Sequence, residues 1–86
     1  MAKLPALSGS DLVRALEKAG FLLVRQRGSH AVLQKRTTDR VLTTVVPQHK
    51  ELAIGTLRAI LRQTHLSPEE LTKFLSLLVG LGHFLK

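Results

Sequence analysis

A histidine stands inside a strongly basic stretch of the chain. The segment RQRGSHAVLQKR, from Arg25 to Arg36, places His30 directly after a Gly-Ser pair, with basic residues on both sides. Histidine titrates near neutrality and can accept or donate a proton. RNA carries its own nucleophile, the 2′-hydroxyl, so its cleavage needs only proton transfer and cations around the phosphate. The residues therefore allow metal-independent RNA cleavage by His30. The alternative is a histidine at the rim of a sheet that bonds to the turn or only touches a phosphate.

Most of the excess positive charge lies in the middle of the chain, between Arg25 and Arg62, a stretch that includes this histidine. The 86 residues include 13 Lys and Arg against 6 Asp and Glu, a formal net charge of +7. A chain with this excess of positive charge binds a polyanion favourably, because its contacts with phosphates release counterions. Aromatic residues make up only 3% of the chain, too few for a base-stacking platform. We therefore predict RNA contact mainly through the backbone, with these positions holding the phosphates: Arg25, Arg27, Lys35, Arg36 and Arg40.

Other reactive side chains give weaker signals. His49 follows a strand, His65 stands at a helix end, and His83 lies near the C-terminus. No two histidines have the i, i+4 spacing of a helical metal site, and the chain has no Cys. We therefore expect neither a metal nor a cofactor. Arg58 and Arg62 stand four residues apart on a predicted helix, and could clamp phosphates or simply remain in solvent.

The elements that position these residues can be read from hydrophobic spacing. Residues 8–20 predict a helix with Ser8 or Ser10 as its cap. Three β-favouring runs follow at 21–27, 30–36 and 41–46, the first two joined by Gly28-Ser29 as a tight hairpin turn. Two further helices are expected at 54–64 and from Ser67, where S-x-x-E forms a capping box. The order α-β-β-β-α-α predicts an α+β fold, with helices on one face of a three-stranded antiparallel sheet and the other face free.

The chain is short enough for one core only. We predict a single domain, 1–86, with a core of about 8–75 and a C-terminal tail, 76–86, of unknown role. Gly80 and Gly82 suggest that the last residues leave the third helix. No long apolar run resembles a secretion signal or a membrane span, so we expect a cytoplasmic protein that does not enter a membrane.

Several motifs together resemble a known family. GSH after a basic strand, followed by VVPQHKELAIGTLRAILRQTHLSPEEL, is similar to the HicA toxins of bacterial and archaeal toxin–antitoxin pairs. The likeness runs from about Ser8 to Leu75. It implies a double-stranded-RNA-binding-domain-like fold and an mRNA interferase activity, that is, an endoribonuclease acting on messenger RNA. The family's G-S-H motif falls on Gly28, Ser29 and His30, which implies that His30 is catalytic and that all three residues lie at the RNA.

The resemblance also implies a protein partner. HicA toxins are neutralised by a HicB antitoxin, so we expect an acidic partner that covers His30 and the arginines, and a free chain that is monomeric. The rival hypothesis is a non-catalytic module that binds double-stranded RNA or, less readily, DNA. Such a module would explain the charge and the open sheet, but it has no particular use for a titratable side chain at position 30.

Overall fold

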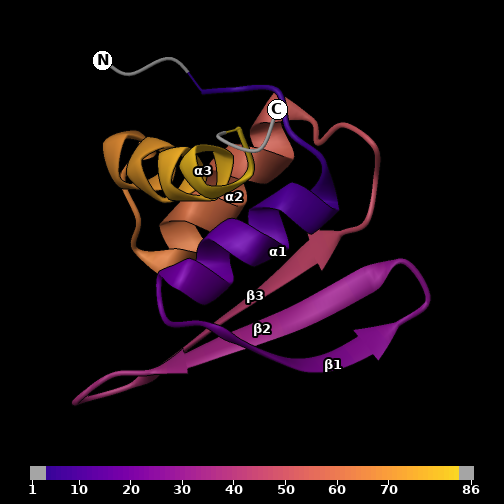
Figure 1. Cartoon of the computed structure of the whole chain (residues 1–86). Coiled ribbons are helices and arrows are strands. Elements are labelled where there is room, and N and C mark those ends of the chain that lie inside the picture. Colours follow the sequence, from indigo (N-terminus) through magenta and orange to yellow (C-terminus); the bar gives the residue numbers. More distant parts are fainter. Residues whose placement is uncertain (1–3, 84–86) are drawn as a thin grey trace.

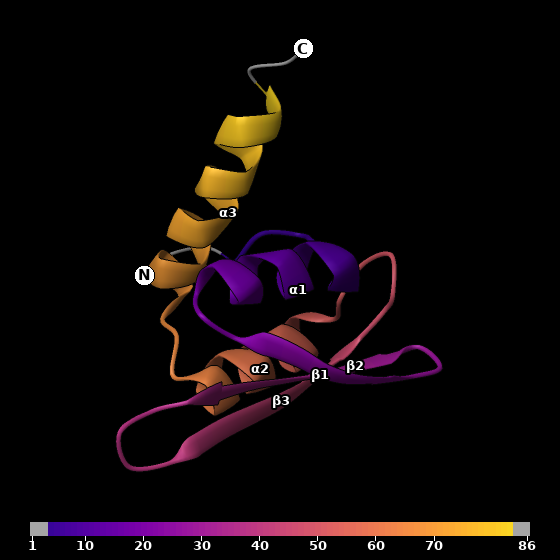
Figure 2. The ribbon, with the colours of Figure 1, turned by 60° about the horizontal axis from the view of Figure 1, so that its bottom comes forward.

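The sheet and its helices follow one another in the predicted order. The computed structural model describes residues 4–83, with side chains up to Leu78. Its elements are α1 (Gly9–Lys18), β1 (Leu22–Arg27), β2 (His30–Arg36), β3 (Val41–Pro47), α2 (Ile54–Thr64) and α3 (Pro68–His83). The strands pair antiparallel in the order β1-β2-β3, and the helices lie on one side of this sheet (Figures 1 and 2). This is the expected α+β fold, in the arrangement of a double-stranded-RNA-binding domain.

Alternating burial shows which face of the sheet meets the helices. In β2, Ala31 and Leu33 are buried, while His30 and Arg36 are exposed. In β3, every second residue is buried in the same way. Successive side chains of a strand point to opposite faces, so the buried set defines an inner face and the exposed set an outer face. The core between the inner face and the helices is apolar, and its largest fully buried side chains include Phe21, Leu12, Leu16, Leu33, Leu57, Ile60 and Leu71.

The turn between β1 and β2 depends on one glycine. Gly28 has a φ of +55°, and Ser29 is not among the residues with positive φ. A two-residue hairpin with positive φ only at its first central position is a type II′ turn, which favours glycine there. A Cβ on Gly28 would meet nothing within 4 Å, so the backbone conformation and not a lack of space selects glycine. This turn fixes the register in which Arg27 faces His30.

Strand β1 contains a bulge that changes the faces of its residues. Leu23 faces Leu33 and Arg25 faces Val32, so Val24 is an extra residue without a partner on β2. One extra residue shifts the alternation of a strand by one position. In an unbroken strand, Arg25 and Arg27 would share the inner face with Leu23. The bulge instead places both arginines on the outer face.

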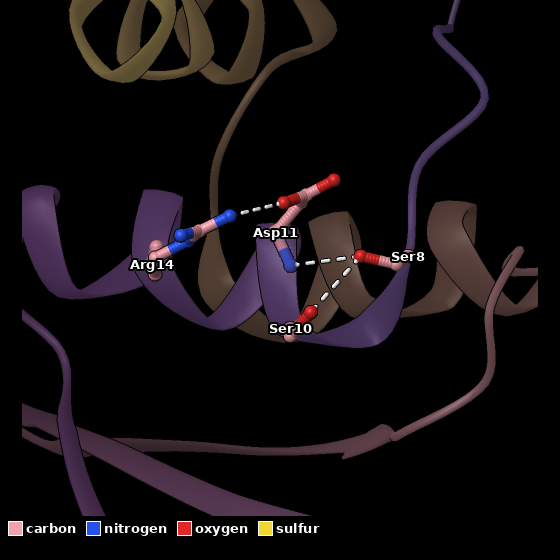
Figure 3. A network of polar contacts seen from close by, with 4 residues as sticks. All are labelled: Ser8, Ser10, Asp11 and Arg14. Atoms are coloured by element: carbon pink, nitrogen blue, oxygen red, sulfur yellow. Dashed lines mark hydrogen bonds and ion pairs between the residues drawn. The ribbon is translucent and has the colours of Figure 1, made fainter. Parts of the chain in front are cut away.

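Helix α1 begins as the sequence predicts, with Ser8 as its N-cap. The Ser8 hydroxyl accepts a hydrogen bond from the Asp11 N–H at 3.1 Å, and Arg14 pairs with the Asp11 carboxylate (Figure 3). These contacts satisfy an N–H group that has no partner within the helix and place a negative charge at the positive end of the helix dipole. The start of the helix also contacts the loop after β3, because the N–H of Gly9 donates to the His49 carbonyl at 2.9 Å.

The last helix confirms one prediction and corrects another. The capping box is present: the Glu70 N–H donates to the Ser67 hydroxyl at 3.0 Å, and the Ser67 N–H donates to the Glu70 carboxylate at 2.9 Å. However, the helix does not end before Gly80 and Gly82, because α3 continues to His83. Glycine costs a helix only about 1 kcal/mol relative to alanine, so two glycines weaken a helix without ending it. The later turns of α3 extend beyond α1 and α2 (Figure 2).

Candidate functional site

The outer face of the sheet forms a regular lattice of side chains, because residues that face one another across antiparallel strands share a face. Its first row, at the end with the Gly28 turn, is Arg27, His30 and Pro47. The second row is Arg25, Val32 and Val45. The third row is Leu22, Gln34 and Thr43, and the fourth pairs Arg36 with Val41. Each strand therefore contributes one column to this face.

His30 is the central residue of the first row and is exposed. Arg27 faces it from β1 and Pro47 from β3, at the Cα separations of about 4.5–5.5 Å that are usual for facing residues. On the β1 side, the Gly28 turn fixes the position of the His30 end of β2. The loop after β3 holds the other side, since the Gln48 N–H donates to the Ser29 carbonyl at 2.6 Å. The histidine thus stands on a braced strand end beside an arginine, with its side chain open to solvent.

The other arginines of the predicted site lie at graded distances from His30. Arg25 is in the second row, one step along β1 from Arg27. Arg36 is on the same face but six residues along β2, or about 20 Å from His30 at the usual rise of a strand. Arg40 lies in the turn between β2 and β3, where it approaches Asp39 at 3.7 Å. Arg25 and Arg27 therefore lie on the same part of the outer face as His30, whereas Arg36 and Arg40 lie farther away toward the other end of the hairpin.

The structure does not bring Lys35 together with these residues. Lys35 lies on the inner side of β2, and its ammonium donates to the Ala19 carbonyl at 2.8 Å. It also stands 5.8 Å from the centre of the Phe21 ring, within the range of a cation–π contact. Ala19 is the C-cap of α1. A cation is favourable at the C-terminal end of a helix, so the position of Lys35 gives it a structural role.

Four other residues considered in the sequence, two arginines and two histidines, also lie off the outer face. Arg58 and Arg62 are exposed on α2, which belongs to the helix layer. His65 is the C-cap of α2, with a left-handed φ of 58°. His49 is exposed in the loop after β3, where its carbonyl accepts the bond from Gly9. These residues surround the domain but do not share the lattice of His30.

Sequence reasoning missed the uncharged part of the outer face. Val41 and Val45 are each 44% exposed, and Leu22 is 70% exposed. The Gln34 side chain donates a weak hydrogen bond to the Thr43 hydroxyl at 3.3 Å between them. The alternation of residues 41–47 was the available signal, since it separates Val41, Thr43 and Val45 from the buried positions of β3.

Taken together, these features define a class of protein: a small α+β domain with an open, basic sheet face and a histidine at its rim. Comparison with known families agrees. The family model described as HicA toxin of bacterial toxin-antitoxin matches residues 9–66, more than half of the chain. The chain therefore belongs to the HicA toxin family. None of the curated proteins matches it. The match contains the whole sheet, α1 and α2, and it ends before α3.

Family membership gives the chain the role of a toxin in a toxin–antitoxin system, and hence a partner antitoxin. Among the residues that the structure describes, no helix is long and apolar enough to cross a membrane.

Proposed function

We propose that this toxin is an endoribonuclease, an mRNA interferase that lays the basic β1 and β2 part of its outer sheet face along RNA and cleaves the backbone with His30. The observation that carries the proposal is the first row of the lattice, where an exposed histidine faces Arg27 on an open sheet end. A histidine there can reach the backbone of a bound polymer without a pocket. Family membership adds support, because the G-S-H motif of HicA toxins falls on this turn.

The chemistry requires little beyond these residues. A neutral imidazole nitrogen of His30 takes the proton of a ribose 2′-hydroxyl, and the 2′-oxygen attacks the adjacent phosphorus. The bond from phosphorus to the 5′-oxygen breaks, and this oxygen takes a proton from solvent at the open rim. The products are a 2′,3′-cyclic phosphate and a 5′-hydroxyl. Arg27, and Arg25 behind it, stabilise the negative charge that develops on the phosphorane.

The other predicted contacts position the RNA. Gly28 and Ser29 form the turn that presents His30, and their backbone can approach a phosphate closely. Arg36 and Arg40 lie further along the hairpin and bind the backbone of neighbouring nucleotides. Lys35 is not part of this surface. No step requires a metal ion, so we expect cleavage to continue in EDTA.

The test is cleavage of a labelled messenger RNA in EDTA by the wild type, by His30→Asn and by His65→Asn. The two variants lose the same kind of exposed side chain, and asparagine tolerates the left-handed conformation at position 65. Because a general base contributes about 100- to 10,000-fold, His30→Asn should lose at least about 100-fold in rate while it keeps its fold and its RNA affinity. His65→Asn should cut like the wild type.

A second substrate separates this mechanism from others. An RNA with one 2′-deoxynucleotide at the preferred cleavage position lacks the nucleophile and should remain intact at that position. Wild-type rates for His30→Asn would reject the catalytic role. Binding without cleavage by all three proteins would identify the chain as a non-catalytic double-stranded-RNA-binding module. We further propose that the antitoxin silences the toxin by covering this face.

A further inference from the structure

The columns of the outer face differ in charge. The β1 column carries Arg25 and Arg27, and the β2 column carries His30 and Arg36. The β3 column has no charge, since it consists of Val41, Thr43, Val45 and Pro47. Affinity for RNA comes mainly from cations at phosphates, so RNA has little reason to follow an uncharged column. The β3 side of the outer face is therefore left for another partner.

β3 is also an edge strand with free backbone groups. The hydrogen bond from the Gln48 N–H to the Ser29 carbonyl fixes the phase of its ladder with β2. Hydrogen-bonded and non-hydrogen-bonded pairs alternate in such a ladder, so the pairs of Thr43 and Val45 with β2 are non-hydrogen-bonded. The N–H and C=O groups of Thr43 and Val45 consequently point away from β2, toward the free edge. Pro47 also belongs to a non-hydrogen-bonded pair, so its lack of an N–H removes no hydrogen bond between β2 and β3.

This edge is open in its middle and closed at one end. Near Pro47 the start of α1 comes so close that a Cβ on Gly9 would lie 2.1 Å from the Pro47 carbonyl oxygen. Within the described part of the chain, Thr43 and Val45 make no backbone hydrogen bond outside the sheet. An unpaired edge of this kind is a template for pairing with another strand.

The opposite edge is less suited to such pairing. β1 also exposes apolar side chains, but it is interrupted by the bulge at Val24 and carries Arg25 and Arg27. Bulges and charges are the usual protections of an edge strand. β3 has neither of these protections between Val41 and Val45. Of the two edges, β3 is therefore the one that can accept a continuous added strand.

We propose that the antitoxin docks by adding an extended, largely uncharged segment beside β3, where it continues the sheet as a fourth strand. The inference rests on the proposed function only in that the partner is the antitoxin of this toxin. An uncharged segment matches the uncharged column, and acidic residues of the same protein can then cover the arginines of β1 and β2. A second copy of this chain is disfavoured, since edge pairing would bring together two basic domains of net charge +7.

The test uses two substitutions at one position. Thr43→Pro removes the N–H that would bond to the added strand, and Thr43→Val keeps it. Both lose the hydroxyl that accepts the 3.3 Å bond from Gln34, so they differ mainly in the edge N–H. The probe is the purified protein encoded by the gene next to that of the toxin. Affinity is measured by calorimetry, RNA cleavage by the free variants in parallel, and folding by circular dichroism.

Thr43→Pro should bind the antitoxin at least about tenfold more weakly than Thr43→Val, the effect of losing a buried interface hydrogen bond, while both variants cut RNA like the wild type. Equal antitoxin affinity of the two variants overturns the proposal. The proposal is also overturned if only Thr43→Pro loses affinity for RNA, because RNA would then occupy the edge. It is overturned as well if the wild type forms a dimer that Thr43→Pro abolishes, because a second copy would then occupy the edge.

Hydrogen exchange provides a measurement that needs no mutant. In the wild-type complex the Thr43 and Val45 amides should become strongly protected, and unchanged exchange at both would overturn the proposal even if Thr43→Pro does not fold. The binding and exchange measurements do not depend on catalysis. A wild type that binds the antitoxin but cuts no RNA would therefore refute the proposed function and leave the docking site standing.

Discussion

Replacement of Lys35 by methionine tests the division of the sheet into two faces. Methionine keeps an unbranched apolar side chain but loses the ammonium that donates to the Ala19 carbonyl at 2.8 Å. A hydrogen bond from a charged donor contributes about 1.5–3 kcal/mol when buried, and the lower end applies to this part-buried bond. The contact with the Phe21 ring, at 5.8 Å, adds about 0.5–1 kcal/mol. We expect a loss of about 2 kcal/mol in the free energy of unfolding.

That loss is large enough to measure as a thermal shift. A domain of 60–100 residues changes its Tm by about 4–8 °C per kcal/mol, so the Lys35→Met variant should melt about 8–16 °C below the wild type. Its RNA affinity, measured below that melting range, should remain unchanged. The dependence of affinity on salt should also keep its slope, because no phosphate contact is lost.

Arg25→Met is the matched comparison, since it removes a cation from the outer face. It should change stability by less than about 0.5 kcal/mol, weaken RNA binding at every sequence, and lower the salt slope by about 1. The reasoning about faces is refuted if Lys35→Met lowers the salt slope without a change in Tm. It is equally refuted if Arg25→Met destabilises the fold and leaves RNA binding intact.

Three further changes test the turn, the helix contact and the ion pair. Gly28→Ala forces a residue with a Cβ into a φ of +55° and should lower the free energy of unfolding by about 1–2 kcal/mol in chemical denaturation. If the folded variant also cleaves RNA more slowly than the wild type, the turn positions His30. Unchanged stability would contradict the turn assignment. Gly9→Ala would place a Cβ 2.1 Å from the Pro47 carbonyl oxygen and should cost about 1–3 kcal/mol by the same assay, whereas a neutral result would show that the contact relaxes freely. The Arg14 guanidinium beside Asp11 holds the pKa of that carboxyl below its ordinary value of 3.8. Because this pKa is lower in the folded state, the contribution of the carboxylate is present above pH 4 and lost as the pH falls below it. Asp11→Asn should therefore be about 0.3–1 kcal/mol less stable than the wild type at pH 7, and this difference should shrink as the pH falls below 4; a difference that does not change with pH would exclude the charge as its cause.

The sequence predicted the elements and their order because each is marked locally. Ser8 and the Ser67–Glu70 box specify helix starts, and Gly28 specifies a two-residue turn. Alternation within residues 30–36 also places His30 and Arg36 on one face and Lys35 on the other. It did not predict which group meets the helices, because each group mixes apolar and polar residues. Only packing of the whole domain settles that question, through burial of Ala31 and Leu33.

The faces of Arg25 and Arg27 were beyond local reasoning for a different reason. Their side depends on the bulge at Val24, and a bulge is defined by the partner strand and not by the residues of β1 alone. The uncharged edge of β3 was visible as a pattern of β-branched residues. Its availability followed only from the sheet order, which makes β3 an outermost strand.

The bulge at Val24 lets two selective pressures act on one strand without conflict. Before the bulge, Leu23 lies opposite the buried Leu33 but is itself 43% exposed; after the bulge, Arg25 and Arg27 lie on the outer face. A substitution on one side of Val24 therefore leaves the requirement on the other side untouched. The arginines beyond the bulge can therefore be replaced without changing the faces on which Leu22 and Leu23 lie. Loss of one residue at this position would be far more damaging than most substitutions, because it would turn Arg25 and Arg27 inward together.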